Sequence, residues 1–182
     1  MLRRIQLLIC FLLSVLALSA CAGNTTGPGD TNTPPASADS PAKTAFVTSL
    51  NFVKANASET QISAGGSAEA IVHVTVQHGY HVNANPPSFP YLKATELTAP
   101  AAEGLSVGFV TYPTSITKKF TFSEKPLAVY EGEVPIKLML KAATWASKAS
   151  HSFAARLTVQ ACDDQVCYPP GTLDISIPVT VK

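Results

Sequence analysis

The stretch AEAIVHVTVQ, residues 68–77, decides the fold class because its apolar and polar residues alternate. Successive side chains of a β-strand point to opposite faces of a sheet, so a period of two indicates a strand with one buried face. The two faces carry Ala70, Val72, Val74 and Val76 on one side, and His73, Thr75 and Gln77 on the other. The stretch therefore predicts a strand whose inner face covers a hydrophobic core.

Five other segments have the β-branched and aromatic character of strands. They are TAFVTSLNFVKA (44–55), LSVGFVTYP (105–113), VPIKLMLKAA (134–143), HSFAARLTVQA (151–161) and TLDISIPVTVK (172–182). Glycines and prolines separate these segments, and PYLKATELTAPAAEG (90–104) is expected to hold a single helical turn at most. About eight short strands with frequent turns predict an all-β protein, an immunoglobulin-like antiparallel β-sandwich.

The segment from Tyr112 to Glu133 interrupts the pattern of strands with two prolines and three lysines between its apolar residues. It is interpreted as a long excursion between strands, and long ordered loops in compact domains are often functional. The alternative is an ordinary hairpin that exposes Lys118 and Lys119. Composition alone does not separate the two interpretations.

The N-terminus indicates export. Residues 1–20 have two arginines, a short apolar run and small residues after it, which together predict a signal peptide. LSAC at 18–21 resembles the bacterial lipobox, which implies cleavage before Cys21 and its lipidation; the alternative is ordinary cleavage near Ala20 or Ala22. Residues 21–43 are then a polar tether, and residues 44–182 are the folded domain. Since Ala22 is not an aspartate, an outer-membrane anchor is favoured over an inner-membrane one.

Charge and motifs narrow the classes of function. The net charge is +1 with no basic run, which argues against nucleic acid as a partner and against electrostatic docking to membranes. The sequence has neither a G-x-S-x-G nucleophile motif nor a glycine-rich phosphate loop. Composition therefore excludes some partners but does not indicate a particular one.

The cysteines offer three alternatives. Of the four, Cys10 leaves with the signal peptide and Cys21 carries lipid, so Cys162 and Cys167 remain as one pair. A disulfide over so short a loop would stabilise the fold by only about 2 kcal/mol, as a local clamp. A metal site would need further ligands, for which His78 and His81 are the candidates. A redox pair is the third alternative, and Asp163 and Asp164 would favour an electron donor because their charges disfavour thiolates.

A resemblance to a known family bears on this choice. ACDDQVCYPPG (161–171) resembles the cysteine motif of the N-terminal periplasmic domain of the thiol:disulfide interchange protein DsbD. Three other pieces fit that family in the expected order: GYHVNANPPS (79–88), Tyr112-Pro113, and YEGEVPIKL (130–138). The resemblance covers residues 44–182 and implies an immunoglobulin-like redox shuttle that needs no cofactor.

The resemblance also implies roles for individual residues. Cys167 would form the mixed disulfide with a partner and Cys162 would resolve it. Tyr80, His81 and Tyr168 would lie beside the pair. An aromatic cap, Phe120 or Phe122, would shield it, although ITKKFTFSEK (116–125) replaces the family's acidic-aromatic cap.

Partners follow from the same resemblance. They would be thioredoxin-like or disulfide-isomerase-type exported proteins, supplied by a separate membrane electron donor, since the 182 residues hold neither a transporter nor a thioredoxin-like domain. The chain would reach them from a lipid anchor on the periplasmic side of a bacterial membrane. The alternative function is a non-catalytic, lipid-anchored interaction domain with a structural disulfide.

Overall fold

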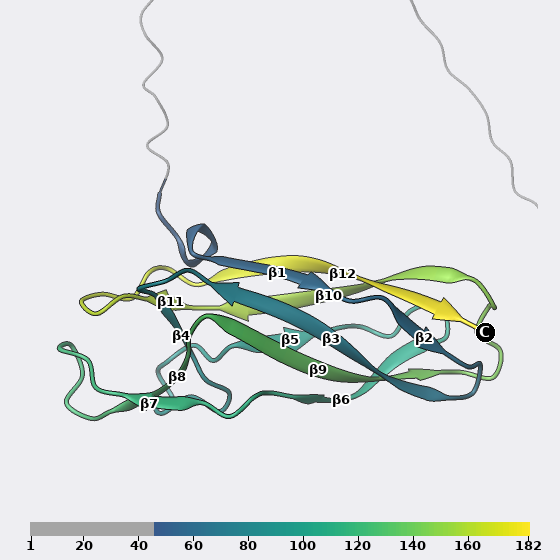
Figure 1. Ribbon diagram of the computed structural model, residues 1–182, viewed down its shortest axis with the longest axis horizontal. Helices are drawn as coiled ribbons and strands as arrows, with labels where there is room; N and C mark the ends of the chain where they lie inside the picture. The colour runs from purple at the N-terminus through teal and green to yellow at the C-terminus, as the bar shows by residue number, and fades with distance from the viewer. Residues whose placement is uncertain (1–45) are drawn as a thin grey trace, which may run out of the picture. The chain divides into compact units, whose positions relative to one another are not determined.

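The computed structural model describes residues 46–182, which form a β-sandwich with one 3₁₀ turn (Figure 1). The predictions of a signal peptide, of lipidation at Cys21 and of a tether over 21–43 lie outside the described residues. No helix within the described part of the chain is both long and apolar enough to cross a membrane.

Twelve strands and the turn follow one another along residues 46–182. They are η1 (Ser49–Asn51), β1 (Val53–Ala57), β2 (Thr60–Ile62), β3 (Ser67–Val76), β4 (His81–Asn83), β5 (Glu96–Thr98), β6 (Leu105–Thr111), β7 (Ile116–Lys118), β8 (Leu127–Tyr130), β9 (Glu133–Ala142), β10 (Ser150–Val159), β11 (Ala161–Cys162) and β12 (Gly171–Val181).

These strands form three sheets. Two of them, ordered β1-β3-β9-β6 and β2-β12-β10-β5, are the layers of the sandwich, and the third, β11-β4-β8-β7, lies at one end of it (Figure 1). All pairings are antiparallel except β2 with β12. The prediction of an all-β, immunoglobulin-like sandwich is confirmed.

The core lies between the two large sheets. In β3 the buried residues are the predicted inner face, while Thr75 on the predicted outer face is exposed and His73 is partly so. Buried and exposed residues also alternate along β9, β10 and β12. Their buried side chains, among them Leu138, Leu157 and Ile177, complete the core. Each such side chain contributes roughly 1.5–3 kcal/mol when it is fully buried.

Two expectations about individual elements were wrong, the start of the first strand and the number of strands. The strand predicted over 44–55 begins only at Val53, because Asn51 accepts a hydrogen bond from the Thr48 amide (2.8 Å) and closes a 3₁₀ turn. Residues 90–104, expected to hold a single helical turn at most, contain no helix and carry β5, which pairs with β10. The count of about eight strands was too low, because strands of two to four residues around the third sheet carry too few residues to show a period.

The excursion from Tyr112 to Glu133 contains strands β7 and β8, which pair as a hairpin. The connection between them, residues 119–126, is called the cap loop below. The structure thus combines the two interpretations of this segment, since an ordinary antiparallel pair carries an eight-residue loop.

Candidate functional site

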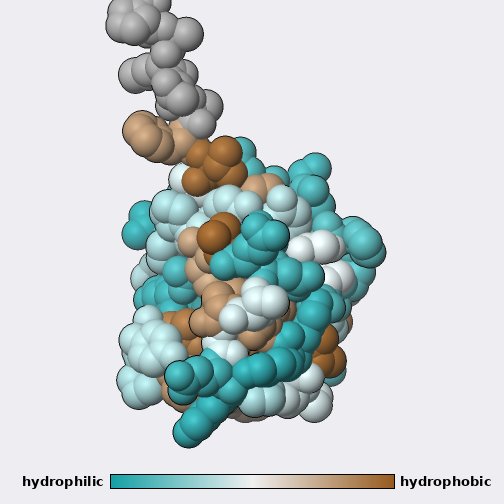
Figure 2. All heavy atoms as spheres, turned by 90° about the vertical axis from the view of Figure 1, so that its left-hand side faces the viewer, coloured by the Kyte–Doolittle hydropathy of each residue, from teal (hydrophilic) through white to brown (hydrophobic). Residues whose placement is uncertain are grey.

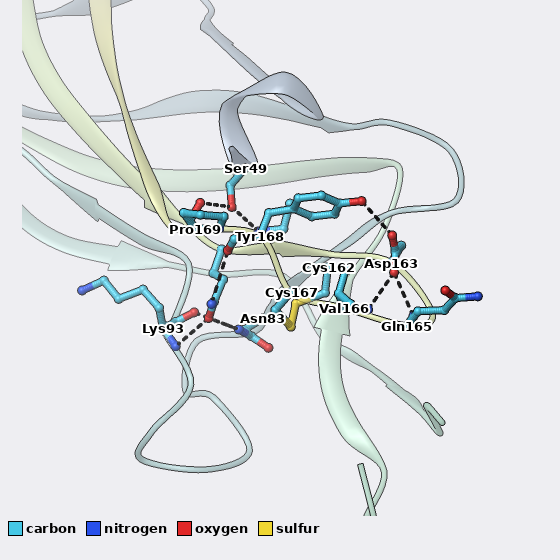
Figure 3. Close-up of a disulfide and its surroundings, with 12 residues drawn as sticks. Ser49, Asn83, Lys93, Cys162, Asp163, Gln165, Val166, Cys167, Tyr168 and Pro169 are labelled. Atoms are coloured by element: carbon cyan, nitrogen blue, oxygen red, sulfur yellow. Dashed lines mark hydrogen bonds between the residues drawn. A yellow bond between two sulfur atoms is a disulfide. The ribbon is translucent and has the colours of Figure 1, made fainter. Parts of the chain in front are cut away.

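Cys162 and Cys167 are joined by a disulfide at the end of the domain that carries the third sheet (Figure 3). Between them the chain turns back, since the Asp163 amide donates to the Val166 carbonyl oxygen at 3.0 Å. The Asp163 carboxylate also accepts from the amides of Gln165 and Val166, each at 2.8 Å. These amide hydrogen bonds lower the pKa of Asp163, and they order the short loop that holds both sulfurs.

The two sulfurs differ in accessibility. Cys162 belongs to β11, which pairs with β4, and it is 0% exposed. Cys167 lies outside that strand and is exposed to solvent. An attacking thiolate from another protein would therefore meet Cys167, while Cys162 stays inside the fold.

The chain after the disulfide is held by hydrogen bonds from two sides. Tyr168 donates its hydroxyl to the Asp163 carboxylate at 2.8 Å, which raises the pKa of Tyr168 to about 12. From the other side, the Ser49 hydroxyl donates to the Pro169 carbonyl oxygen and accepts from the Ala161 amide, both at 2.8 Å (Figure 3). The η1 turn therefore fastens the start of the domain to both ends of the cysteine loop.

The predicted neighbours Tyr80 and Tyr168 belong to one aromatic cluster. Tyr80 stacks on Phe52 with ring centroids 3.8 Å apart, and Tyr168 is tilted against the same Phe52 ring at 4.6 Å. Tyr168 directly follows Cys167, whereas Tyr80 reaches the loop through this cluster. The structure thus brings both residues to the site as a packed support beside the loop.

His81 lies directly opposite Cys162 in the pairing of β4 with β11. It is buried, its ring stacks on Phe120 at 4.0 Å, and its Nε2 has no hydrogen-bond partner. Burial lowers the pKa of His81 to about 4, because the charged imidazolium is poorly solvated there. His81 is therefore neutral at pH 7.

The four side chains considered as metal ligands, those of two cysteines and two histidines, do not form a site in the structure. The two sulfurs are bonded to each other, His81 is buried and His78 is exposed on a turn. Across residues 46–182, no group of three or more histidine, cysteine, aspartate or glutamate side chains is arranged to hold a metal ion.

The cap loop lies against the cysteine loop. Thr121 donates its hydroxyl to the Asp164 carbonyl oxygen at 2.7 Å, and Lys118 at the end of β7 is 3.8 Å from the Asp164 carboxylate. Phe120 is buried, whereas Phe122 stacks on it at 5.3 Å and remains 40% exposed. The structure brings both predicted cap residues to the site, Phe120 inside the fold and Phe122 at the surface.

An apolar cleft opens beside Cys167. It has a volume of about 400 Å³, and its lining includes Phe89, Tyr91, Leu92, Phe122, Leu127 and Cys167. Figure 2 looks onto this end of the domain and shows apolar patches between polar ones. Tyr91 is 78% exposed, so the exposed sulfur of the disulfide borders a surface with large apolar side chains that face the solvent.

Stability is expected to fall as the pH decreases from about 6.5 to 4. In that range the unfolded chain protonates its histidine while the folded chain keeps His81 neutral, so protons favour unfolding. The full shift corresponds to roughly 3 kcal/mol. Urea unfolding of the wild type and of His81→Leu at pH 7.5 and pH 4 measures this loss, which should be much smaller in the variant.

The charges around His81 come from Lys118, Glu131, Asp163 and Asp164. They and other carboxylates change stability in both chains alike, so the difference between the two pH responses isolates His81. An equal loss in the variant and the wild type would contradict the assignment.

Comparison with known proteins gives one family. Residues 51–178 match the family described as the thiol:disulfide interchange protein DsbD, N-terminal. A search of curated proteins gives no match. Among solved structures, the reduced N-terminal domain of DsbD from Neisseria meningitidis is similar at 18% identity and a TM-score of 0.46, covering 71% of this chain and 86% of that one. The N-terminal periplasmic domain of ScsB from Proteus mirabilis is similar at 18% identity and a TM-score of 0.46, covering 70% of this chain and 45% of that one.

Proposed function

Because this chain belongs to the family of the N-terminal domain of the thiol:disulfide interchange protein DsbD, we propose that it passes reducing equivalents between exported proteins through Cys162 and Cys167. The observation that carries the proposal is the asymmetry of the disulfide, in which one sulfur is exposed beside an apolar cleft and the other is buried. A dithiol that exchanges in two steps needs one sulfur that a partner can reach and one that stays within the domain.

The chemistry of loading is two successive displacements. A thiolate of the electron donor attacks the Cys167 Sγ, the bond between the two cysteines breaks, and Cys162 leaves as a thiolate with the electron pair. A second donor thiolate then attacks the donor's own sulfur in the mixed disulfide and releases Cys167. The donor becomes a disulfide, and the domain gains two electrons and, with solvent protons, two thiols.

Unloading reverses these roles. The Cys167 thiolate attacks the disulfide of the acceptor, and the Cys162 thiolate then attacks the Cys167 sulfur and frees the reduced acceptor. Every electron passes between sulfurs, so no cofactor takes part in the scheme.

The partners in this proposal are thioredoxin-like or disulfide-isomerase-type exported proteins, with a separate membrane protein as electron donor. The apolar cleft beside Cys167 supports a protein partner, since exposed aromatic side chains are enriched where proteins meet. A lipid on Cys21 would hold the domain at the periplasmic side of a bacterial membrane, the outer membrane being favoured. Residues 21–43 would be the tether that lets the domain reach its partners.

A non-catalytic, lipid-anchored interaction domain is the second candidate function. It is favoured by the number of hydrogen bonds that hold the cysteine loop, from Asp163, Tyr168 and Ser49. Such a frame also suits a disulfide that never opens. The two candidates differ in how easily the bond is reduced.

The reduction potential of the pair tests the proposed function. We expect a value above about −300 mV, since disulfides below that potential resist reduction and act as structural bonds. The measurement equilibrates the purified protein with thiol buffers of graded potential, alkylates free thiols and counts the modified cysteines by mass spectrometry. The Cys162→Ala/Cys167→Ala double variant gives the background from other cysteines. A potential below −300 mV would favour the structural disulfide.

A further inference from the structure

Among residues 46–182, two buried side-chain nitrogen or oxygen atoms have no hydrogen-bond partner, and both belong to β4. They are the His81 Nε2 and the Asn83 Oδ1. Residues two apart in a strand point to the same face, so both side chains lie on one side of this short strand. Buried polar groups almost always find partners, and an exception calls for a functional explanation.

The pairing of β4 with β11 identifies the residues next to these two side chains. His81 is the register partner of Cys162, and the Asn83 amide donates to the Gln160 side chain at 3.4 Å. Directly opposed residues of an antiparallel pair share a face, with Cβ atoms roughly 5 Å apart. The His81 ring and the Cys162 sulfur therefore project from the same side of the sheet as neighbours.

The closed disulfide gives such a ring little to bind. Its sulfurs have no proton to donate and are weak acceptors. When the bond opens, Cys162 becomes a thiolate and then a thiol, which are respectively a charged acceptor and a donor. The reduced Cys162 is thus the kind of partner that the His81 Nε2 lacks in the oxidised domain.

Resting on the proposed function, we propose that His81 is a positioning residue for the exchange: its Nε2–H donates a hydrogen bond to the Cys162 sulfur as the disulfide opens. The bond to Cys167 breaks, the electron pair stays on Cys162, and the incoming thiolate is joined to Cys167. His81 remains neutral throughout and neither gains nor loses a proton. Solvent supplies the proton that converts the thiolate to a thiol.

The surroundings make this donor effective. Phe120 covers the His81 ring at 4.0 Å, and hydrogen bonds are stronger where water is excluded. The charged groups facing His81 are Lys118, Glu131, Asp163 and Asp164, and Lys118 is paired with Glu131 at 2.8 Å. Because this set is acidic in sum, it disfavours a thiolate, and a neutral N–H donor opposes that effect.

The test titrates Cys162 in the reduced, full-length protein by the ¹³Cβ chemical shift of labelled cysteine, which resolves each thiol separately. In His81→Leu, the midpoint for Cys162 should rise by about one pH unit or more, since a charged hydrogen bond is lost. Opening of the oxidised protein by dithiothreitol should slow at least threefold, because a less acidic thiol leaves more slowly. His81→Gln, which keeps an N–H donor, should restore part of both effects.

His78→Leu is the matched control, because His78 is exposed on the turn before β4, and it should behave as the wild type. If His81→Leu folds and both readouts match those of the wild type, His81 has no role in the exchange, although the exchange itself would stand. If dithiothreitol does not open the wild-type disulfide in the folded protein, both the proposed function and the role of His81 are overturned.

Discussion

Cys162→Ala is expected to accumulate mixed disulfides with other exported proteins in cells, and Cys167→Ala is expected to accumulate at least tenfold less. In the first variant the exposed Cys167 attacks a partner, and no buried sulfur remains to release it. In the second variant the remaining sulfur, Cys162, is 0% exposed and lies in a paired strand, so a partner's disulfide does not reach it. Acid quenching, alkylation and non-reducing gels followed by mass spectrometry of the adducts measure the difference.

The double variant Cys162→Ala/Cys167→Ala is the control for adducts formed by Cys10 or Cys21. Equal yields of adduct in the two single variants would remove the assignment of attacking and resolving sulfurs. Absence of adducts from both would support the interaction domain with a permanent disulfide. The identity of any trapped protein would also name the class of partner, which the cleft beside Cys167 does not specify.

The large sheets were predictable from the sequence because their strands are long. Ten residues of alternating character, as in β3, leave one consistent choice of buried face. The sheet that carries the site was much less predictable. Its strands have two to four residues, and all three residues of β4 are buried, so no alternation distinguishes a face. A strand of this kind is recognised only after its partners are known.

The cysteine pair and its aromatic neighbours were predictable, while the contact of Ser49 with the loop and the register of His81 against Cys162 were not. Ser49 contacts the loop from 120 positions earlier in the chain, and His81 meets Cys162 through a register set by tertiary packing. Neither residue type is unusual by itself. His81 was predicted both as a candidate metal ligand and, from its place in the GYHVNANPPS segment that resembles the DsbD family, as a neighbour of the cysteine loop. Contacts between residues this far apart in the chain leave no pattern in the local sequence.

Phe120→Ala is expected to lower the free energy of unfolding by about 3 kcal/mol and to speed reduction of the disulfide by dithiothreitol at least tenfold. Phe120 is 3% exposed and forms a small apolar cluster with Leu127 and Val129, so its loss leaves a cavity. The same ring supports Phe122, which lines the cleft beside Cys167. Without this anchor the cap loop should detach locally and expose the sulfur.

Two further variants separate anchoring from shielding. Phe122→Ala removes a ring that is 40% exposed, so it should change stability by less than about 1 kcal/mol while still speeding reduction several-fold. Phe109→Ala on β6 removes an exposed ring that lines no part of the cleft, and both quantities should match those of the wild type.

If Phe120→Ala destabilises the fold but leaves the rate of reduction within twofold of the wild type, the cap loop does not shield the disulfide. A rate that rises only in proportion to global unfolding, seen as a steep dependence on urea, would likewise rule out local opening, because the sulfur would then be reached through the unfolded chain.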